Sequence, residues 1–211
     1  MYYNIHTHSS INHPEVIELI NQYPNEVNFQ YDTFSVGIHP WYLDENRLTE
    51  DIERMELIIQ HPKCKAIGEC GLDKRIETSI EVQKKVLIPQ LYLAEKYKKP
   101  VILHCVAAYQ EIIEIKKQLN LSIPLIIHGF SKNSQVAASL IKNDFYLSFG
   151  KYLLLNPELS IVLKQVPTDR IFLETDMMDH SIFDVYRKAE DIIQLGVKNI
   201  IKQNYNRVFN P

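Results

Sequence analysis

Short apolar segments that end in a metal-binding side chain recur along this chain. They span residues 5–8, 66–69, 101–104, 125–128 and 171–176, and the side chains at their ends are histidine, glutamate or aspartate. A strand buried on both faces has a continuous apolar sequence, and parallel strands place their carboxyl ends at the same edge of a sheet. The segments therefore predict a parallel α/β fold with one shared polynuclear metal site.

The spacing of the apolar runs predicts a barrel. Strands are expected at residues 3–8, 34–39, 65–69, 101–104, 125–128, 145–149 and 171–174. Between them, apolar residues such as Ile52, Met55 and Ile58 recur at helical spacing. Residues 26–31 could supply an eighth strand, although too few residues separate them from the next run for a crossover helix. We predict a (β/α)8 TIM barrel trimmed by one crossover helix near the N-terminus, with an open doubly wound sheet as the alternative.

Length and composition predict a single soluble domain. The 211 residues suffice for one large core, so we expect residues 1–211 to form one domain. A net charge of -3 provides no basic footprint for nucleic acid. We find no signal peptide and no run of about 18 apolar residues, and the odd number of cysteines includes no C-x-x-C pair. These features predict a cytoplasmic protein with reduced thiols and no membrane association, and they indicate no protein partner.

Histidines and carboxylates at the predicted strand ends are the candidate metal ligands. His6 and His8 lie two residues apart on a strand, so both side chains leave the same face and can bind one ion. A carboxylate such as Glu69 is costly to bury unless it is paired or binds a metal, and it can bridge two ions. A salt bridge to a basic residue of the barrel is the alternative for Glu69. The predicted ligands are His6, His8, Glu69, His104, His128 and Asp176.

The mixed ligand set predicts hydrolytic chemistry. Imidazoles with carboxylates fit Zn, Mn or Fe better than Ca or Mg. We expect two divalent ions, for which Zn, Mn and Mg are all candidates because the sequence does not name the metal. Two ions about 3.5 to 4 Å apart can hold a hydroxide and polarise a phosphoryl or carbonyl oxygen. Asp176 could be a ligand, a general base or both. Glu174 could orient a ligand histidine or form a structural ion pair, and Asp73 is placed similarly.

Other catalytic schemes find little support in the sequence. It contains no G-x-S-x-G elbow, no glycine-rich phosphate loop with G-K-[ST] and no G-x-G-x-x-G motif. Cys105 follows His104 directly, but strand neighbours point to opposite faces, so we expect a buried thiol there. His39 ends another apolar run, where it could contact substrate or cap the mouth of the barrel.

The order of these motifs resembles the TatD family of metal-dependent hydrolases, which are amidohydrolase-type TIM barrels whose members cut DNA. The resemblance rests on His6-x-His8, Gly37-Ile38-His39-Pro40, Gly68-Glu69-x-Gly71-Leu72-Asp73, His104, His128-x-Phe130-Ser131 and Glu174-Thr175-Asp176. It implies one ion among His6, His8, Glu69 and Asp176 and another among Glu69, His104 and His128, so that Glu69 is the bridge. By analogy, Asp176 and Glu69 are catalytic and Asp176 takes the proton from the attacking water. His39 and Ser131 are candidate substrate contacts.

Departures from the family pattern lie around the substrate. Val106 stands where an arginine is usual, and a guanidinium there would suit a bidentate phosphate contact. Lys132, Met178 and Asn4 stand where glycine, proline and aspartate are usual. The chain is also shorter than usual between its first two apolar runs, where a loop would normally help to wall the cleft.

The expected function is therefore a two-metal phosphodiesterase that acts on DNA, from an end or on single strands. A small-molecule amidohydrolase or esterase with the same two-metal site is the first alternative, because Val106 and the acidic net charge favour it. A catalytically inactive barrel with a structural or binding role is the second, and the intact ligand set argues against it. Substrate, cleavage polarity, metal identity and oligomeric state stay open at this stage.

Overall fold

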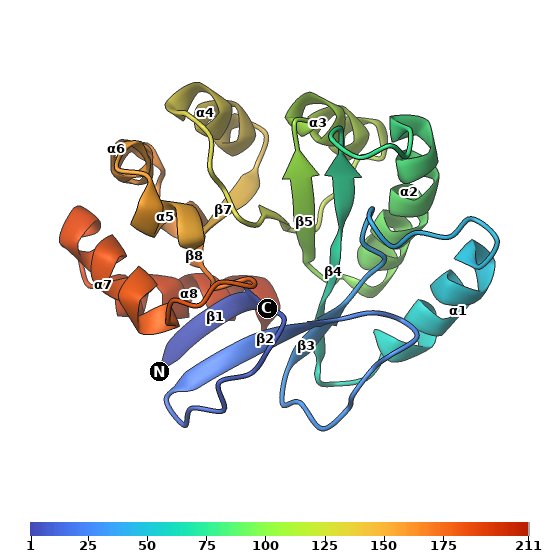
Figure 1. Ribbon diagram of the computed structural model, residues 1–211, viewed down its shortest axis with the longest axis horizontal. Coiled ribbons are helices and arrows are strands. Elements are labelled where there is room, and N and C mark those ends of the chain that lie inside the picture. Colours follow the sequence, from blue (N-terminus) through green and yellow to red (C-terminus); the bar gives the residue numbers. More distant parts are fainter. Residues whose placement is uncertain (211) are drawn as a thin grey trace. The chain divides into compact units, whose positions relative to one another are not determined.

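The computed structural model describes residues 1–210, in which strands and helices alternate after an all-strand beginning (Figure 1). The strands are β1 (Tyr2–Thr7), β2 (Val16–Gln22), β3 (Phe34–Val36), β4 (Cys64–Asp73), β5 (Val101–Val106), β6 (Leu125–Ile127), β7 (Phe145–Phe149) and β8 (Ile171–Leu173). The helices are α1 (Leu48–Ile58), α2 (Ile80–Tyr97), α3 (Tyr109–Gln118), α4 (Ser134–Lys142), α5 (Lys151–Leu155), α6 (Glu158–Gln165), α7 (Ile182–Ile193) and α8 (Val197–Phe209). The strands follow one another in the sheet in their order along the chain, which is the strand order of a (β/α)8 barrel. The predicted fold class is confirmed.

The eighth strand is β2, and the prediction of a strand at residues 26–31 was wrong. Those residues form turns and irregular backbone, whereas Tyr2 and Tyr3 of β1 pair with Val16 and Ile17 of β2. The side chain of Gln22 exchanges hydrogen bonds with the backbone of residue 28, which closes a loop directly after β2. Within residues 1–210 no helix precedes α1. The connections from β1 to β2 and from β2 to β3 therefore both lack a crossover helix, whereas the sequence predicted that only one would be missing.

The chain divides into two compact units, and the first combines Met1–Ile20 with the chain from Ile126 onward. In this unit β1 pairs with β2, β7 pairs with β8, and Thr7 forms a parallel bridge with Asp176 just beyond β8. Helix α8 packs against both β1 and β8. The first and last strands are therefore neighbours, as a closed ring of strands requires.

The second unit spans Asn21–Leu125 and contains β3, β4 and β5. β4 pairs in parallel with both β3 and β5, and α2 packs along β4 while α3 packs on β5 (Figure 1). Ser79 caps the N-terminus of α2, because its side chain accepts a hydrogen bond from the backbone N–H of Val82. β4 is thus the central strand of this unit, paired on both edges and covered by a helix.

β4 and β5 continue beyond the ends that the sequence predicted. Residues 70–73 follow Glu69 within β4, residues 105–106 follow His104 within β5, and the two segments pair in register. Most of these added residues are buried, and burial of apolar side chains favours continuing the strand. Glu69 and His104 therefore leave their strands before the ends, and the predicted ends were wrong. The thiol of Cys105 is buried, as predicted.

Gly71 allows β4 to approach β5 closely. Its φ is +152°, and a Cβ at this position would lie 1.9 Å from the backbone carbonyl oxygen of His104. We expect Gly71→Ala to lower the free energy of unfolding by at least about 2 kcal/mol, because steric overlap adds to backbone strain. Denaturant unfolding measures this loss. Gly196→Ala is the control, since φ there is +72° but nothing lies within 4 Å of the added Cβ. Equal losses for the two variants would contradict the steric argument.

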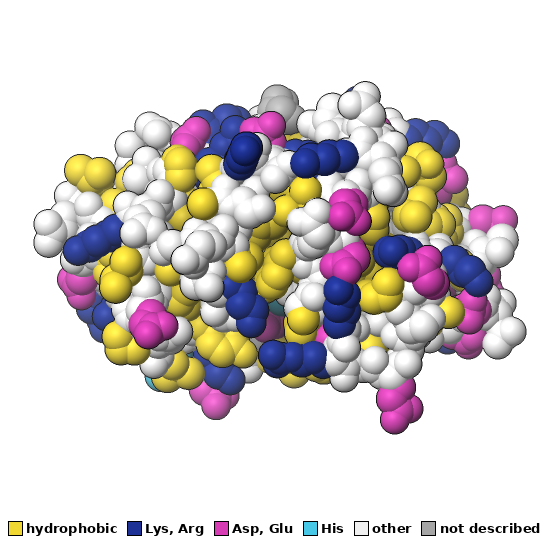
Figure 2. All heavy atoms as spheres, turned by 90° about the horizontal axis from the view of Figure 1, so that it is seen from above, with side chains coloured by type: hydrophobic (Ala, Val, Ile, Leu, Met, Phe, Trp, Pro, Cys, Tyr) yellow, Lys and Arg dark blue, Asp and Glu magenta, His cyan; other side chains and the backbone are white. Residues whose placement is uncertain are grey.

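Charges of both signs are mixed on the surface. On the face drawn in Figure 2, lysine and arginine side chains lie scattered among acidic and hydrophobic ones. Because these charges are scattered, any attraction of a polyanion to the face in Figure 2 must come from local contacts.

None of the helices in the described part of the chain has both the length and the hydrophobicity needed to cross a membrane.

Candidate metal centre

Three ligand atoms converge in the first unit, where β1 and β8 end. Nε2 of His6 lies 3.5 Å and Nε2 of His8 lies 3.4 Å from Oδ1 of Asp176. The backbone N–H of Asp176 donates to the carbonyl oxygen of His6 at 2.9 Å, which holds the aspartate beside β1. The ligand atoms of these three residues all lie within 4.8 Å of one another. Two imidazoles and one carboxylate at this spacing are a common donor set for Zn or Fe.

The charge state of Asp176 suits cation binding. Burial would raise the pKa of this carboxyl group, but hydrogen bonds from His6 and His8 and the charges of His6 and His128 lower it below its usual range. Asp176 is therefore ionised at neutral pH. Its side chain is 40% exposed, so it is also reachable by solvent and small ions.

Asn4 and Thr175 fix the segment that carries Asp176. Nδ2 of Asn4 donates to Oγ1 of Thr175 at 2.8 Å, and the backbone N–H of Thr175 donates to Oδ1 of Asn4 at 3.0 Å. An asparagine supplies a donor and an acceptor together, whereas an ionised aspartate only accepts, which gives a physical reason for the departure at position 4. The backbone N–H of Met178 donates to the carbonyl oxygen of Thr175 at 3.1 Å, a bond that proline could not make.

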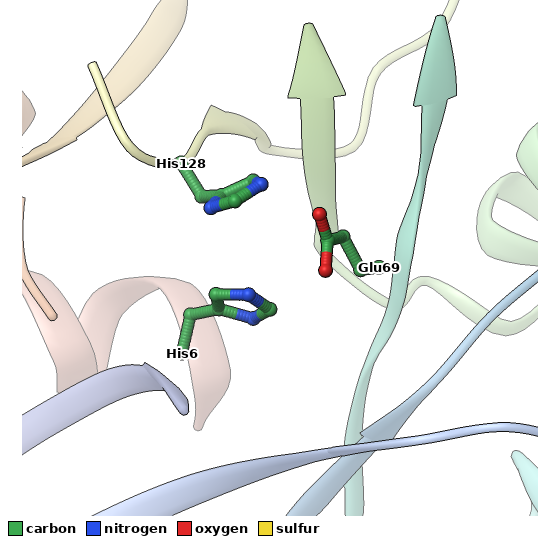
Figure 3. Close-up of side chains that lie close together, drawn as sticks. All are labelled: His6, Glu69 and His128. Atoms are coloured by element: carbon green, nitrogen blue, oxygen red, sulfur yellow. The ribbon is translucent and has the colours of Figure 1, made fainter. Parts of the chain in front are cut away.

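His128 lies beside His6 in the same unit (Figure 3), with 4.4 Å between ring centroids. Nδ1 of His128 lies 3.4 Å from Oε1 of Glu174, and the backbone N–H of Gly129 donates to the same oxygen at 2.7 Å. Glu174 is fully buried. A carboxylate that holds the proton of one ring nitrogen leaves the other nitrogen for an ion. The position of Glu174 beside His128 is compatible with an orienting role, which stays a prediction.

The second unit holds its own group, formed by His39, Glu69 and His104. Oε1 of Glu69 lies 3.1 Å from Nε2 of His39 and 3.0 Å from Nδ1 of His104. The carboxylate projects from β4 (Figure 3), and its side chain is 5% exposed. The backbone N–H of Glu69 donates to Oδ1 of Asn21 at 2.5 Å, which fixes the strand at this point. A buried carboxylate between two imidazoles has the environment of a metal ligand.

The hydrogen bonds of His39 indicate that it is a hydrogen-bond partner of Glu69 rather than a metal ligand. The backbone N–H of Trp41 donates to Nδ1 of His39 at 3.1 Å, so this nitrogen carries no proton. In the neutral imidazole the proton is then on Nε2, where it faces Glu69. The sequence offered no signal for this contact, because His39 lies in the segment after β3, Glu69 lies in β4, and no spacing links them. The expected substrate contact of His39 stays a prediction.

Asp73 orients His104. Oδ2 of Asp73 lies 3.2 Å from Nε2 of His104 and accepts the indole N–H of Trp41 at 2.9 Å. Burial would raise the pKa of Asp73, but the bonds from Trp41, the backbone N–H of Arg75 and His104 lower it. An ionised Asp73 holds the proton on Nε2 of His104 and leaves Nδ1 directed toward Glu69. The sequence placed Asp73 beside Glu174 as a possible orienting residue, and the contact agrees with that role.

The structure gives few contacts for the predicted substrate residue Ser131 and for two positions that depart from the family pattern, Lys132 and Val106. Ser131 and Lys132 are half-buried in the segment between β6 and α4, and nothing in the structure explains the lysine in place of the usual glycine. Val106 is the half-buried last residue of β5. Its apolar side chain cannot make the phosphate contact that the usual arginine would make.

The strand order and the two groups of histidines and carboxylates define a TIM-barrel protein with the ligand types of a metal-dependent hydrolase. The family of TatD related DNases matches residues 2–210. This chain belongs to the TatD family.

The chain is also similar to individual proteins in sequence and in structure. The uncharacterized metal-dependent hydrolase YabD of Bacillus subtilis is 33% identical over 165 residues, which are 76% of this chain and 62% of YabD. The 3'-5' ssDNA/RNA exonuclease TatD of Erwinia tasmaniensis is 28% identical over 77% of this chain and 62% of its own length. This chain thus spans about three fifths of these relatives. The crystal structure of YJJV, a TatD homologue from Escherichia coli, has a TM-score of 0.84 at 19% identity and covers 100% of this chain and 98% of YJJV. It confirms the fold.

Proposed function

We propose that this protein is a metal-dependent hydrolase that cleaves phosphodiester bonds in single-stranded DNA or RNA. The observation that carries the proposal is the convergence of His6, His8 and Asp176, whose ligand atoms lie within 4.8 Å of one another in the first unit. In the second unit Nδ1 of His104 lies 3.0 Å from Oε1 of Glu69. Membership of the TatD family supports the reaction class, and a relative named as a 3'-5' ssDNA/RNA exonuclease supports the substrate. Residues 1–211 are proposed to act as one hydrolase domain. Its three cysteines are buried free thiols, which agrees with the cytoplasmic location we propose.

Two divalent ions, Zn, Mn or Mg, are proposed as cofactors. The proposed ligands are His6, His8, His128 and Asp176 in the first unit and Glu69 and His104 in the second. When bound, such ions lower the pKa of a coordinated water and stabilise negative charge on phosphoryl oxygens. The bridging role of Glu69 stays a prediction from the family resemblance.

The chain's own residues then have distinct tasks. Asp176 is ionised and partly exposed, so it is the group proposed to accept a proton from the attacking water. Nε2 of His39 donates to Oε1 of Glu69 and so orients that carboxylate. Asp73 and Glu174 hold the rings of His104 and His128, respectively. The two catalytic residues we propose, Glu69 and Asp176, are thus both positioned by neighbouring hydrogen bonds.

A small-molecule amidohydrolase or esterase is the second candidate function. Val106 favours it, because an apolar side chain replaces a phosphate-binding arginine. The scattered charges on the face in Figure 2 point the same way. In this case the same residues would serve attack on a carbonyl carbon.

The experiment that separates these functions compares substrates under equal metal loading. Metal-free protein is reloaded with Zn, Mn or Mg. Each metal form is incubated with single-stranded DNA, single-stranded RNA, duplex DNA, and a panel of small esters and amides. The nuclease proposal predicts metal-dependent cleavage, faster on single strands than on duplex. Strands labelled at either end report the polarity. Turnover of small esters alone would favour the second candidate, and binding of ions without hydrolysis of any substrate would refute both.

A further inference from the structure

Trp41 combines solvent exposure with a fixed position. Its relative exposure is 57%, yet its indole N–H donates to the buried carboxylate of Asp73 at 2.9 Å. Its ring centroid lies 5.2 Å from that of His39 and 5.8 Å from that of His104. Because the hydrogen bond restricts the side chain in advance, a ligand that contacts the ring loses little rotamer entropy on binding. Trp41 is therefore a preorganised contact surface beside the Glu69 group.

Tyr42 extends this aromatic surface to a cavity. Its relative exposure is 64%, and its ring lies 5.5 Å from that of Tyr23 and 5.6 Å from that of His39. These three rings, together with Pro24 and Arg47, line a cavity of about 350 Å³. Ligand pockets in proteins are about 300 to 1,000 Å³, so the space suits one small planar group.

Arg47 gives the cavity a cationic donor. Nη2 of Arg47 lies 3.3 Å from Oδ1 of Asp51, and the arginine side chain is 49% exposed while the aspartate is 7% exposed. The buried Asp51 thus anchors a guanidinium that solvent and ligands can still reach. A guanidinium can stack on a base, bond to its edge or contact an adjoining phosphate.

We propose that Trp41, Tyr42 and this cavity bind an unpaired nucleobase of a single-stranded nucleic acid, beside His39 and His104. Stacking on aromatic rings holds any base, because every base has a flat π-face. The proposal rests on the nuclease function proposed above and names how that site holds its substrate.

Stacking would also compensate for the lack of net positive charge on this chain. A polyanion usually binds through many basic contacts, but the net charge is -3 and Val106 replaces a usual arginine. Aromatic stacking supplies affinity that does not depend on net positive charge. A nucleobase therefore fits the aromatic residues, the small cavity and the shortage of cations together.

The single tryptophan makes the site directly observable. Since Trp41 is the only tryptophan in the chain, its fluorescence reports on this site alone. The metal-loaded full-length protein is titrated with a hydrolysis-resistant phosphorothioate oligothymidylate and with an abasic oligomer of equal length. We expect the oligothymidylate to quench the emission and to bind about tenfold tighter than the abasic oligomer. Equal affinities with unchanged emission would overturn the proposal.

Variants at position 41 separate stacking from the support of Asp73. Trp41→Phe keeps a stacking ring but loses the indole N–H, whereas Trp41→Leu loses both, so only the leucine variant should raise KM for oligothymidylate about tenfold. Loss of the hydrogen bond to Asp73 should lower kcat to the same extent in both variants and on both oligomers, whereas the rise in KM for oligothymidylate should occur in Trp41→Leu alone. Tyr92→Leu on α2 is the control, because Tyr92 has the same 57% exposure outside the site. Equal KM for oligothymidylate in the Phe and Leu variants would show that Trp41 acts only through Asp73 and would overturn the proposal.

The outcomes also separate this inference from the nuclease function. Cleavage of both oligomers at equal rates and equal KM would overturn the stacking site and leave the nuclease function standing. Absence of binding and of cleavage with every metal would overturn the nuclease function and the stacking site with it.

Discussion

Glu69→Gln is expected to lower kcat for hydrolysis by at least about 10² to 10³-fold while the fold is kept. The substitution removes the negative charge that Oε1 presents to Nε2 of His39 and Nδ1 of His104. An amide also presents N–H donors where a donor from His39 already points, so the side chain would turn. Steady-state kinetics measure the loss, and elemental analysis of the purified variant should show fewer bound ions per chain.

Glu53→Gln provides the matched control for this experiment. Glu53 is an exposed residue of α1 in the same unit, so the same chemical change there should leave kinetics and metal content unaltered. Thermal unfolding of both variants completes the comparison. A Glu69 variant that loses stability but keeps its specific activity would show that this carboxylate is structural and would contradict the assigned role.

Asp176→Asn is expected to lower kcat by at least about 10²-fold, because the variant has neither the charge to bind an ion nor the basicity to accept a proton. The pKa of Asp176 is lowered, so the wild-type carboxylate is ionised across the neutral range. Asp191→Asn, on the exposed face of α7, is the control. Wild-type kcat and metal content in the Asp176→Asn variant would exclude this aspartate from the site.

The same variant should alter the acid stability of the metal-free protein. A carboxyl group whose folded pKa lies below its unfolded value of about 3.9 stabilises the fold above that pH and loses this contribution as the pH falls through the folded pKa. Asp176→Asn should therefore flatten the decline of stability below about pH 4. Solvent screening reduces the size of the effect, since the side chain is 40% exposed. Denaturant unfolding as a function of pH measures it, and an unchanged acid slope would contradict the assigned pKa shift.

Much of the fold could be predicted because parallel strands buried on both faces leave continuous apolar runs. Seven of the eight strands overlap such runs, and β7 has the predicted bounds of Phe145–Phe149. β2 was missed because its sequence, VIELINQ, mixes polar and apolar residues and no helix follows it. The sequence thus reveals strands through burial, and it is least informative where a strand is only partly buried.

The candidate ligands and two possible orienting residues, Asp73 and Glu174, could be proposed from the sequence, but the contact between His39 and Glu69 could not. His6, His8 and Asp176 converge, although position 176 is far from the other two along the chain. The pairing of His39 with Glu69 depends on how the segment that follows β3 lies against β4. The local sequence shows which type of residue follows an apolar run. It does not show which distant residue that side chain will contact.

The most direct test of the central claim is the rate of cleavage of a single-stranded oligonucleotide as metal-free protein is titrated with Mn or Zn, with bound ions per chain measured in parallel. We expect no cleavage without ions, a rate that rises with ion occupancy up to two per chain, and loss of both ions and rate in Glu69→Gln. Full cleavage by the metal-free protein, or two bound ions with no hydrolysis of any phosphodiester or ester, would contradict it.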